Sequence, residues 1–142
     1  MPTRHATATW EGGLQKGKGS FSGESGAVSA SFSFGSRFEQ AKGSNPEELL
    51  AAAEAACYSM ALSAGLEQAG TPVTKVETRA AVTIEKVAAG FAITSIKLVV
   101  RATVPGIDAA KFKAAAEKTK ETCPVSQALK AVPIELDAQL VT

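Results

Sequence analysis

The sequence predicts an α+β fold, and three of its features support that prediction. The first third contains short, glycine-punctuated segments in which small polar and apolar residues alternate, as they do in half-buried strands. One long apolar helix follows, and after it come two segments rich in Val, Ile and Thr around a tight turn. The length of 142 residues fits one domain, so we expect residues 1–142 to fold as a single domain.

Strands are expected near the start of the chain over His5–Trp10 and Val28–Phe34. The segment Gly17–Gly23 between them is glycine-rich, but its spacing matches neither the dinucleotide-binding fingerprint nor the phosphate-binding loop. We therefore expect this segment to be a turn between strands. A loop is expected next, over Gly35–Gly43.

The clearest helix of the chain begins at Asn45. Asn is a good N-cap, Pro46 suits the first helical position, and an acidic pair favours the positive end of the helix dipole. The acidic pair is Glu47 and Glu48. The apolar run continues to about residue 69, and Gly70 ends it.

After its first turn this helix carries charge only at Glu54 and Glu67. A helix that is apolar on nearly all sides must be buried on nearly all sides. Because one domain of this length has difficulty surrounding such a helix, we expect a partner subunit to cover one of its faces.

The rest of the chain predicts a β-hairpin, two helices and a strand. Asp108 is a good cap for the first of these helices, and Cys123-Pro124 separates the two. The full expected order is therefore β-β-β-α-β-β-α-α-β. The segments are Val73–Val87 and Phe91–Val104 with a turn at Ala88–Gly90, then helices over Ala109–Thr122 and Val125–Lys130, and a strand over Pro133–Val141.

Composition argues against several kinds of partner. The formal net charge is +1 and the lysines are scattered, so there is no basic face of the kind that nucleic-acid binders carry. The first ten residues lack the apolar core of a signal peptide, and no run approaches the roughly 20 apolar residues that span a membrane. We therefore expect a cytoplasmic protein with mostly reduced thiols and no membrane partner.

Metal and cofactor sites are not indicated. The chain has one histidine, His5, and two cysteines, which are too few N and S ligands for a four-ligand zinc site. His5 lies near the N-terminus and is expected at the surface. No segment matches a metal, flavin or haem site, so no cofactor is expected.

The two cysteines, Cys57 and Cys123, are the most informative residues of the chain. Neither belongs to a CxxC motif, Cys57 lies inside the long helix, and Cys123 precedes a proline that can open another helix. Backbone N–H groups at a helix start stabilise a thiolate, and we expect that effect at Cys123. The pair indicates a peroxidatic cysteine with a distant resolving partner, although Cys57 also fits a small core residue. Their spacing of 66 residues does not show whether the sulfurs meet.

Short segments spread in order along nearly the whole chain carry a family resemblance. They are Trp10-Glu-Gly12, Gly17-Lys-Gly19, Arg37-Phe38, Asn45-Pro-Glu-Glu-Leu49, Ala55-Ala-Cys57-Tyr-Ser-Met60, Gly90-Phe-Ala-Ile-Thr-Ser-Ile96, Pro105-Gly-Ile-Asp108 and Cys123-Pro-Val-Ser-Gln127. Together they resemble the OsmC/Ohr family of thiol-dependent organic hydroperoxide reductases, and more closely its OsmC branch. The resemblance implies an intertwined homodimer, in which β-sheets wrap two long central helices and two sites lie at the subunit interface. It also implies reduction of organic hydroperoxides and, less efficiently, of hydrogen peroxide.

The same resemblance implies a role for each candidate site residue. Cys57 is the peroxidatic thiol and Cys123 the resolving thiol, and Arg37 stabilises the Cys57 thiolate. Glu47 orients Arg37, with Glu48 as the competing acid. A guanidinium suits this task because it is always charged and a carboxylate can hold it by two parallel hydrogen bonds. The implied reductant is an external dithiol, in this family often a lipoyl-bearing protein.

Helix geometry predicts that the acid acts between subunits. Glu47 and Cys57 are ten residues apart on one helix, and so about 15 Å apart along its axis. Two copies of the helix that cross antiparallel near residue 52 would bring Glu47 of one subunit beside Cys57 of the other. The alanines around that position permit a close approach, although alanine is also simply the best helix former.

Two other functions fit the same residues. One is a dimer with an apolar cleft that holds a small hydrophobic ligand, its thiols being incidental. The other is a thiol redox sensor that reacts once per site without turnover. The phenylalanines are expected in the core, and some of them could instead line an apolar pocket; they are Phe32, Phe34, Phe38, Phe91 and Phe112.

Overall fold

The structure is a computed structural model that describes residues 1–141 and divides into two compact units, Met1–Leu49 and the part that begins at Leu50. In chain order its elements are β1 (Ala6–Glu11), β2 (Lys18–Gly23), β3 (Ser29–Phe32), α1 (Phe34–Phe38), α2 (Pro46–Gln68), β4 (Lys75–Val87), β5 (Gly90–Thr103), α3 (Ala109–Thr122), α4 (Pro124–Ala128) and β6 (Ile134–Leu140). The expected α+β class is confirmed. The long helix, the hairpin, the two later helices and the last strand end within two residues of their expected bounds.

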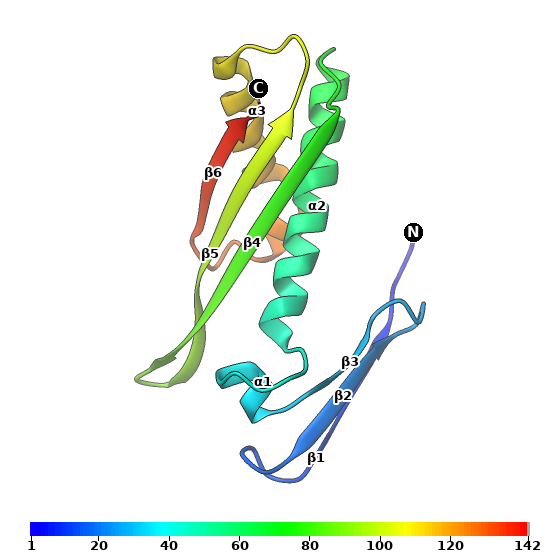
Figure 1. Ribbon diagram of the computed structural model, residues 1–142, viewed down its shortest axis with the longest axis vertical. Coiled ribbons are helices and arrows are strands. Elements are labelled where there is room, and N and C mark those ends of the chain that lie inside the picture. The colour runs from blue at the N-terminus through cyan, green and yellow to red at the C-terminus, as the bar shows by residue number, and fades with distance from the viewer. Residues whose placement is uncertain (142) are drawn as a thin grey trace. The chain divides into compact units, whose positions relative to one another are not determined.

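The first unit contains a three-stranded antiparallel sheet in the order β1-β2-β3 (Figure 1). The predicted turn over Gly17–Gly23 is wrong, because most of this segment is the central strand β2. Gly19 has aromatic rings over it: a Cβ there would lie 2.6 Å from Phe32 Cε1 and 2.7 Å from Trp10 Cε3. The glycine therefore allows the strand to pass close beneath two packed rings, and does not mark a turn.

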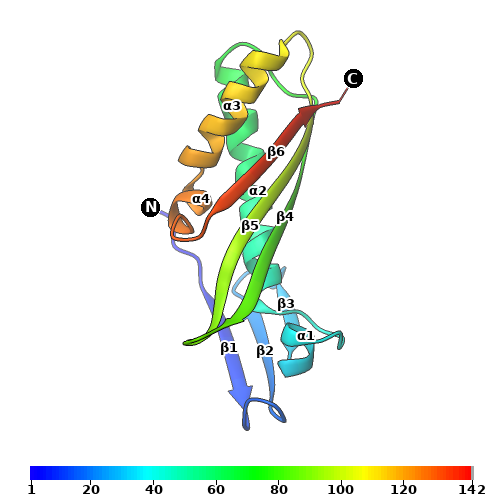
Figure 2. The same cartoon turned by 90° about the vertical axis from the view of Figure 1, so that its left-hand side faces the viewer.

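The second unit contains a sheet in the order β4-β5-β6. β4 and β5 form the expected antiparallel hairpin, while β6 pairs with β5 in parallel, so α3 and α4 form the crossover between these two strands. Figures 1 and 2 show α2 and α3 on the same face of this sheet. That arrangement leaves the core between one sheet face and the helices.

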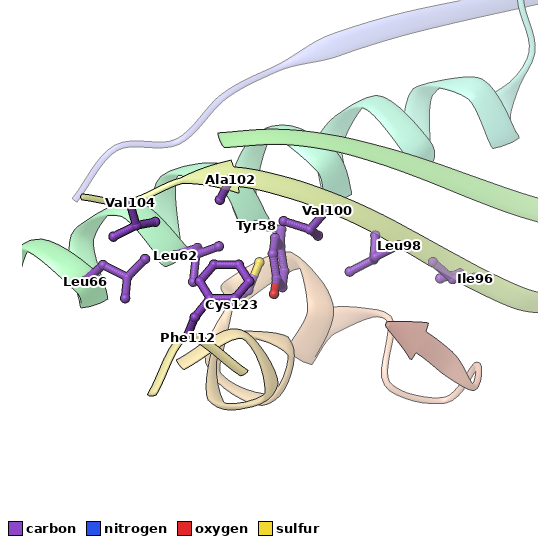
Figure 3. Close-up of a cluster of buried hydrophobic side chains, with 10 residues drawn as sticks. All are labelled: Tyr58, Leu62, Leu66, Ile96, Leu98, Val100, Ala102, Val104, Phe112 and Cys123. Carbon is purple, nitrogen blue, oxygen red and sulfur yellow. The ribbon is translucent and has the colours of Figure 1, made fainter. Parts of the chain in front are cut away.

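The core of the second unit is a single cluster under β5. Alternate residues of β5 point toward the helices, as the two-residue period of a strand requires. Figure 3 shows how the side chains of α2, α3 and β5 meet there, with the sulfur of Cys123 among them. The buried members are Tyr58, Leu62, Leu66, Ile96, Leu98, Val100, Ala102, Val104, Phe112 and Cys123.

Tyr58 joins α2 to α3 inside this core. Its ring is fully buried, and its hydroxyl donates to the carbonyl oxygen of Ala116 at 2.8 Å. Burial, reinforced by the charge of Glu117, raises the pKa of Tyr58 well above its ordinary value of 10.0. The phenol therefore keeps its proton and remains a hydrogen-bond donor.

Within the part of the chain that the structure describes, the buried side chains of α2 form one stripe. Glu54, Tyr58, Leu62 and Leu66 are buried at four-residue intervals. The side of α2 that carries Ala52, Ala53, Ala56 and Met60 is exposed, Met60 with 75% of its surface. This is a face of the kind that a partner subunit was expected to cover.

By length and composition, α2 is long and apolar enough to cross a membrane. The expectation that no segment approaches this length is therefore corrected. The core helix of a soluble protein can have the same length and composition. Tyr58, Leu62 and Leu66 pack into a protein core, which is the behaviour of a core helix.

Candidate active site

The two thiols meet in the second unit. Cys57 lies in the middle of α2, and Cys123 lies between α3 and α4 as the C-cap of one and the N-cap of the other. Their Sγ atoms are 3.0 Å apart, so the free thiols form a hydrogen-bonded pair. Cys57 is half-buried, whereas Cys123 is only 1% exposed. A molecule from solution therefore reaches Cys57 more readily than Cys123.

Within one chain, the surroundings of Cys57 favour the thiol over the thiolate. Burial raises the pKa of Cys57 above its ordinary value of 9.0, and the hydrogen bond with Cys123 raises it further. The backbone N–H of Val125 hydrogen-bonds to Cys57 and lowers the pKa, and the charges of Cys123 and Glu54 raise it. A cation brought close to this sulfur would shift the balance toward the thiolate.

The start of α4 provides a backbone N–H to a different sulfur from the one expected. The sequence predicts that helix N–H groups stabilise Cys123, and this prediction is wrong. Cys123 makes no side-chain capping hydrogen bond, because its sulfur points toward Cys57. The N–H of Val125, one residue into α4, hydrogen-bonds to Cys57 instead.

In the first unit, Arg37 and Glu47 form a two-point ion pair. Arg37 Nε donates to Glu47 Oε1 at 3.0 Å, and Arg37 Nη2 donates to Glu47 Oε2 at 2.9 Å. Glu48 is engaged elsewhere, since the hydroxyl of Ser44 donates to its Oε1 at 3.0 Å. The acid that holds Arg37 is therefore Glu47. The Arg37 side chain is 35% exposed, against 7% for Glu47, so the guanidinium keeps a surface that is open for another contact.

Arg37 lies on a helix that the sequence analysis missed, because α1 occupies part of the expected loop. Ser33 caps α1: its Oγ accepts from the Ser36 N–H, and the Ser36 Oγ accepts from the Ser33 N–H. A five-residue helix shows no apolar period, and a serine stands here where the usual capping box has Glu or Gln. No clear sequence signal was therefore present.

Hydrogen bonds tie α1 to the start of α2 and so orient Arg37. The Ser36 hydroxyl donates to the Ser44 carbonyl at 2.7 Å. Asn45 Nδ2 donates to the Ser36 carbonyl at 3.0 Å, while its Oδ1 accepts from the Glu48 N–H at 2.8 Å. The N-cap that begins α2 therefore also fixes the helix that carries Arg37.

An apolar pocket of about 200 Å³ lies beside Arg37 in the first unit. It is lined by Trp10, Leu14, Phe32, Ser33, Phe34, Arg37 and Phe38. The Arg37 guanidinium lies over the Phe38 ring, 5.3 Å from its centroid. Three of the five phenylalanines expected in the core or in a pocket thus line this pocket, and Phe112 lies in the core. Phe91 is 50% exposed next to the hairpin turn, so its expected core position is wrong.

A buried carboxyl that sequence reasoning did not assign to the site lies one helical turn before Cys57. Glu54 is fully buried, and its Oε1 accepts a hydrogen bond from the hydroxyl of Ser126. Its Oε2 has no hydrogen-bond partner within residues 1–141. Leaving such a group unpaired costs about 1–3 kcal/mol. The sequence did contain a signal for this residue, because Glu54 is a single acidic residue in the middle of an otherwise apolar helix.

A hydrogen-bonded pair of free thiols on this α+β fold indicates a dithiol redox protein. The family model described as OsmC-like protein matches residues 39–137. The chain therefore belongs to the OsmC family.

Known relatives match the chain over 94% or more of its length. It is 53% identical over 134 residues to "Peroxiredoxin OsmC" of Escherichia coli (strain K12), which covers 94% of this chain and 93% of the relative. The solved organic hydroperoxide resistance protein OhrB of Bacillus subtilis is similar with a TM-score of 0.74 and 25% identity, covering 95% of this chain and 98% of that one. An organic hydroperoxide resistance protein from Elizabethkingia anophelis has a TM-score of 0.71 and 25% identity, covering 100% and 97%. The expected OsmC-like fold is confirmed.

Proposed function

We propose that this chain is a cysteine-based peroxidase that reduces organic hydroperoxides to alcohols, and hydrogen peroxide less efficiently. The observation that carries the proposal is the Cys57–Cys123 contact of 3.0 Å, in a chain 53% identical to a relative named a peroxiredoxin. The sulfurs need to approach by only about 1 Å to reach the length of an S–S bond. A disulfide can therefore form with little rearrangement.

In the proposed cycle Cys57 is the peroxidatic thiol and Cys123 the resolving thiol. The Cys57 thiolate attacks the distal peroxide oxygen, the O–O bond breaks, and the leaving alkoxide takes a proton to become the alcohol. Cys123 sulfur then attacks the sulfur of the resulting sulfenic acid, so that the S–S bond forms, the S–O bond breaks and water leaves. An external dithiol restores both thiols by exchange, and a lipoyl-bearing protein is the expected donor. The greater exposure of Cys57 supports this assignment.

Arg37 and Glu47 are proposed to stabilise the Cys57 thiolate of a second subunit. Ten residues of α2 separate Glu47 from Cys57, which is about 15 Å along the helix axis. Two α2 helices that cross antiparallel near residue 52 bring the Arg37–Glu47 pair of one subunit to Cys57 of the other. The exposed alanines of α2 support such a homodimer, because small side chains let two helices approach closely.

The organic part of the substrate is proposed to bind in the apolar pocket beside Arg37. The pocket is lined largely by aromatic rings, and Arg37 is one of its lining residues. An alkyl or aromatic group gains free energy by leaving water there, while the polar peroxide group stays near the cation. This arrangement favours organic hydroperoxides over hydrogen peroxide, which has no apolar part. We further propose that the protein is soluble and cytoplasmic, where its thiols are kept reduced.

The proposed function predicts catalytic turnover of cumene hydroperoxide. Reduced protein with excess dithiothreitol should consume many equivalents of peroxide per Cys57, measured as the loss of peroxide over time. Reaction with a single equivalent per site would instead identify a redox sensor. No reaction at all would reject thiol chemistry and favour a dimer that binds a small hydrophobic ligand.

Replacement of the cation should move the ionisation of Cys57 to higher pH. Arg37→Met removes a positive charge that favours the thiolate, so the pKa of Cys57 should rise by about one unit or more. The measurement is ultraviolet thiolate absorbance against pH in a Cys123→Ser background, where one thiol remains. Arg101→Met is the matched control, because Arg101 pairs with Asp137 at 3.1 Å on β5 and β6. Equal midpoints for Arg37→Met and the parent protein would contradict the role of Arg37.

A further inference from the structure

Two residues that the proposed cycle does not use join the same two segments as the cysteines do. Glu54 lies three residues before Cys57 on α2, and Ser126 lies three residues after Cys123 in α4. The Ser126 hydroxyl donates to Glu54 Oε1, while the two sulfurs lie 3.0 Å apart. Positions three residues apart on a helix lie on one face, so these are neighbouring contacts between α2 and the segment that carries the resolving thiol.

The segment that carries Cys123 needs such a contact. Helix α4 has only five residues, and a helix this short is not stable without tertiary packing. Besides the sulfur contact, the N–H of Val125 links α4 to Cys57. Val125 and Leu129 add apolar packing against the core, but both polar contacts end on the sulfur of Cys57, which changes chemically when it is oxidised. The Glu54–Ser126 hydrogen bond does not involve that sulfur, and so it can persist through the reaction.

The burial of Glu54 also costs folding free energy. It is fully buried, and its Oε2 makes no hydrogen bond within the described part of the chain. An apolar side chain there would simply extend the buried stripe of Tyr58 and Leu62. A buried polar group that is only partly satisfied calls for an explanation, and functional sites are one place where such groups are expected.

We propose that Glu54 and Ser126 are a positioning pair, whose hydrogen bond holds the Cys123 segment against α2 so that Cys123 Sγ stays within reach of Cys57 Sγ when Cys57 is oxidised. The pair thereby raises the effective concentration of Cys123 at Cys57. Its biological purpose rests on the proposed peroxidase cycle. Its physical action is disulfide closure, which can be measured without peroxide.

Glutathione provides that measurement. The Cys57 thiolate attacks glutathione disulfide, forming a mixed disulfide and releasing one glutathione thiolate. Cys123 sulfur then attacks Cys57 sulfur, so that the protein disulfide forms and a second glutathione leaves with the thiol proton. Equilibration in buffers of known ratio between glutathione and its disulfide, followed by alkylation and intact mass, gives the effective concentration of the pair.

Ser126→Ala removes the donor and Glu54→Leu removes the acceptor, and each should lower the effective concentration about tenfold. Ser126→Thr and Glu54→Gln keep a hydroxyl and an acceptor oxygen, so each should restore most of the wild-type value. The matched control is Ser59→Ala, which removes another serine hydrogen bond of α2, the 2.8 Å contact with Thr78. Circular dichroism establishes that each variant is folded.

An unchanged effective concentration in Ser126→Ala would overturn the proposal. So would a Glu54→Gln variant that behaves like Glu54→Leu, because charge and not the hydrogen bond would then be the cause. Peroxide is tested separately on the same proteins. Wild-type protein that forms its disulfide with glutathione but does not react with cumene hydroperoxide would reject the peroxidase function alone.

Discussion

Cys57→Ser is expected to abolish the reduction of cumene hydroperoxide, with turnover falling by at least about 10³-fold. A serine hydroxyl does not ionise near neutral pH and cannot attack the O–O bond as a thiolate does. Cys123 is only 1% exposed, so it is too buried to replace the lost nucleophile. The measurement is the steady-state loss of peroxide with dithiothreitol as reductant.

Cys123→Ser is the matched control, since it removes the other sulfur of the same contact. This variant should still react once with one equivalent of peroxide, and a sulfenic-acid trap should label Cys57. Wild-type protein treated in the same way should lose both alkylation sites to the disulfide. Turnover that survives in Cys57→Ser, together with a Cys123→Ser variant that no longer reacts, would reverse the two roles.

Mixed dimers should recover activity that neither parent has. Arg37→Met and Cys57→Ser are each expected to be nearly inactive alone. If Arg37 serves Cys57 of the other subunit, a dimer with one copy of each variant contains one intact site. Random exchange of subunits would then restore about a quarter of the wild-type activity. The measurement is peroxide turnover after the two variants are co-refolded.

A second mixture tests whether the recovery has the proposed cause. Cys57 and Cys123 meet within one chain, so mixing Cys57→Ser with Cys123→Ser should restore no intramolecular disulfide. If activity recovers in both mixtures, the subunits must exchange the segments that carry Cys57 and Cys123. Recovery in neither would place Arg37 beside Cys57 of its own chain, and the crossing of α2 helices near residue 52 would have to be given up.

Elements with strong local signals were predicted well. The α2 helix has an N-cap, a proline at its first position and a glycine after its end, and its bounds came within one residue. Elements that depend on packing were missed. β2 looks like a turn because it contains Gly19, which accommodates the rings of Trp10 and Phe32 from the neighbouring strands. α1 depends on a serine pair and on bonds to the start of α2, neither of which forms a periodic pattern.

By itself, the sequence determined the α+β class, most helix and strand bounds, the family and the two residues capable of thiol chemistry. The class, the bounds and the thiol residues follow from local propensity, composition and residue identity, and the family follows from the resemblance of short segments spread along the chain. Only the tertiary structure decided that Cys57 and Cys123 meet, that Glu47 and not Glu48 holds Arg37, and that Glu54 is buried against Ser126. Each of these is a pairing between residues on different elements. Such pairings depend on how helices and strands pack, because side-chain contacts reach only a few ångströms and sequence spacing does not fix distances in space.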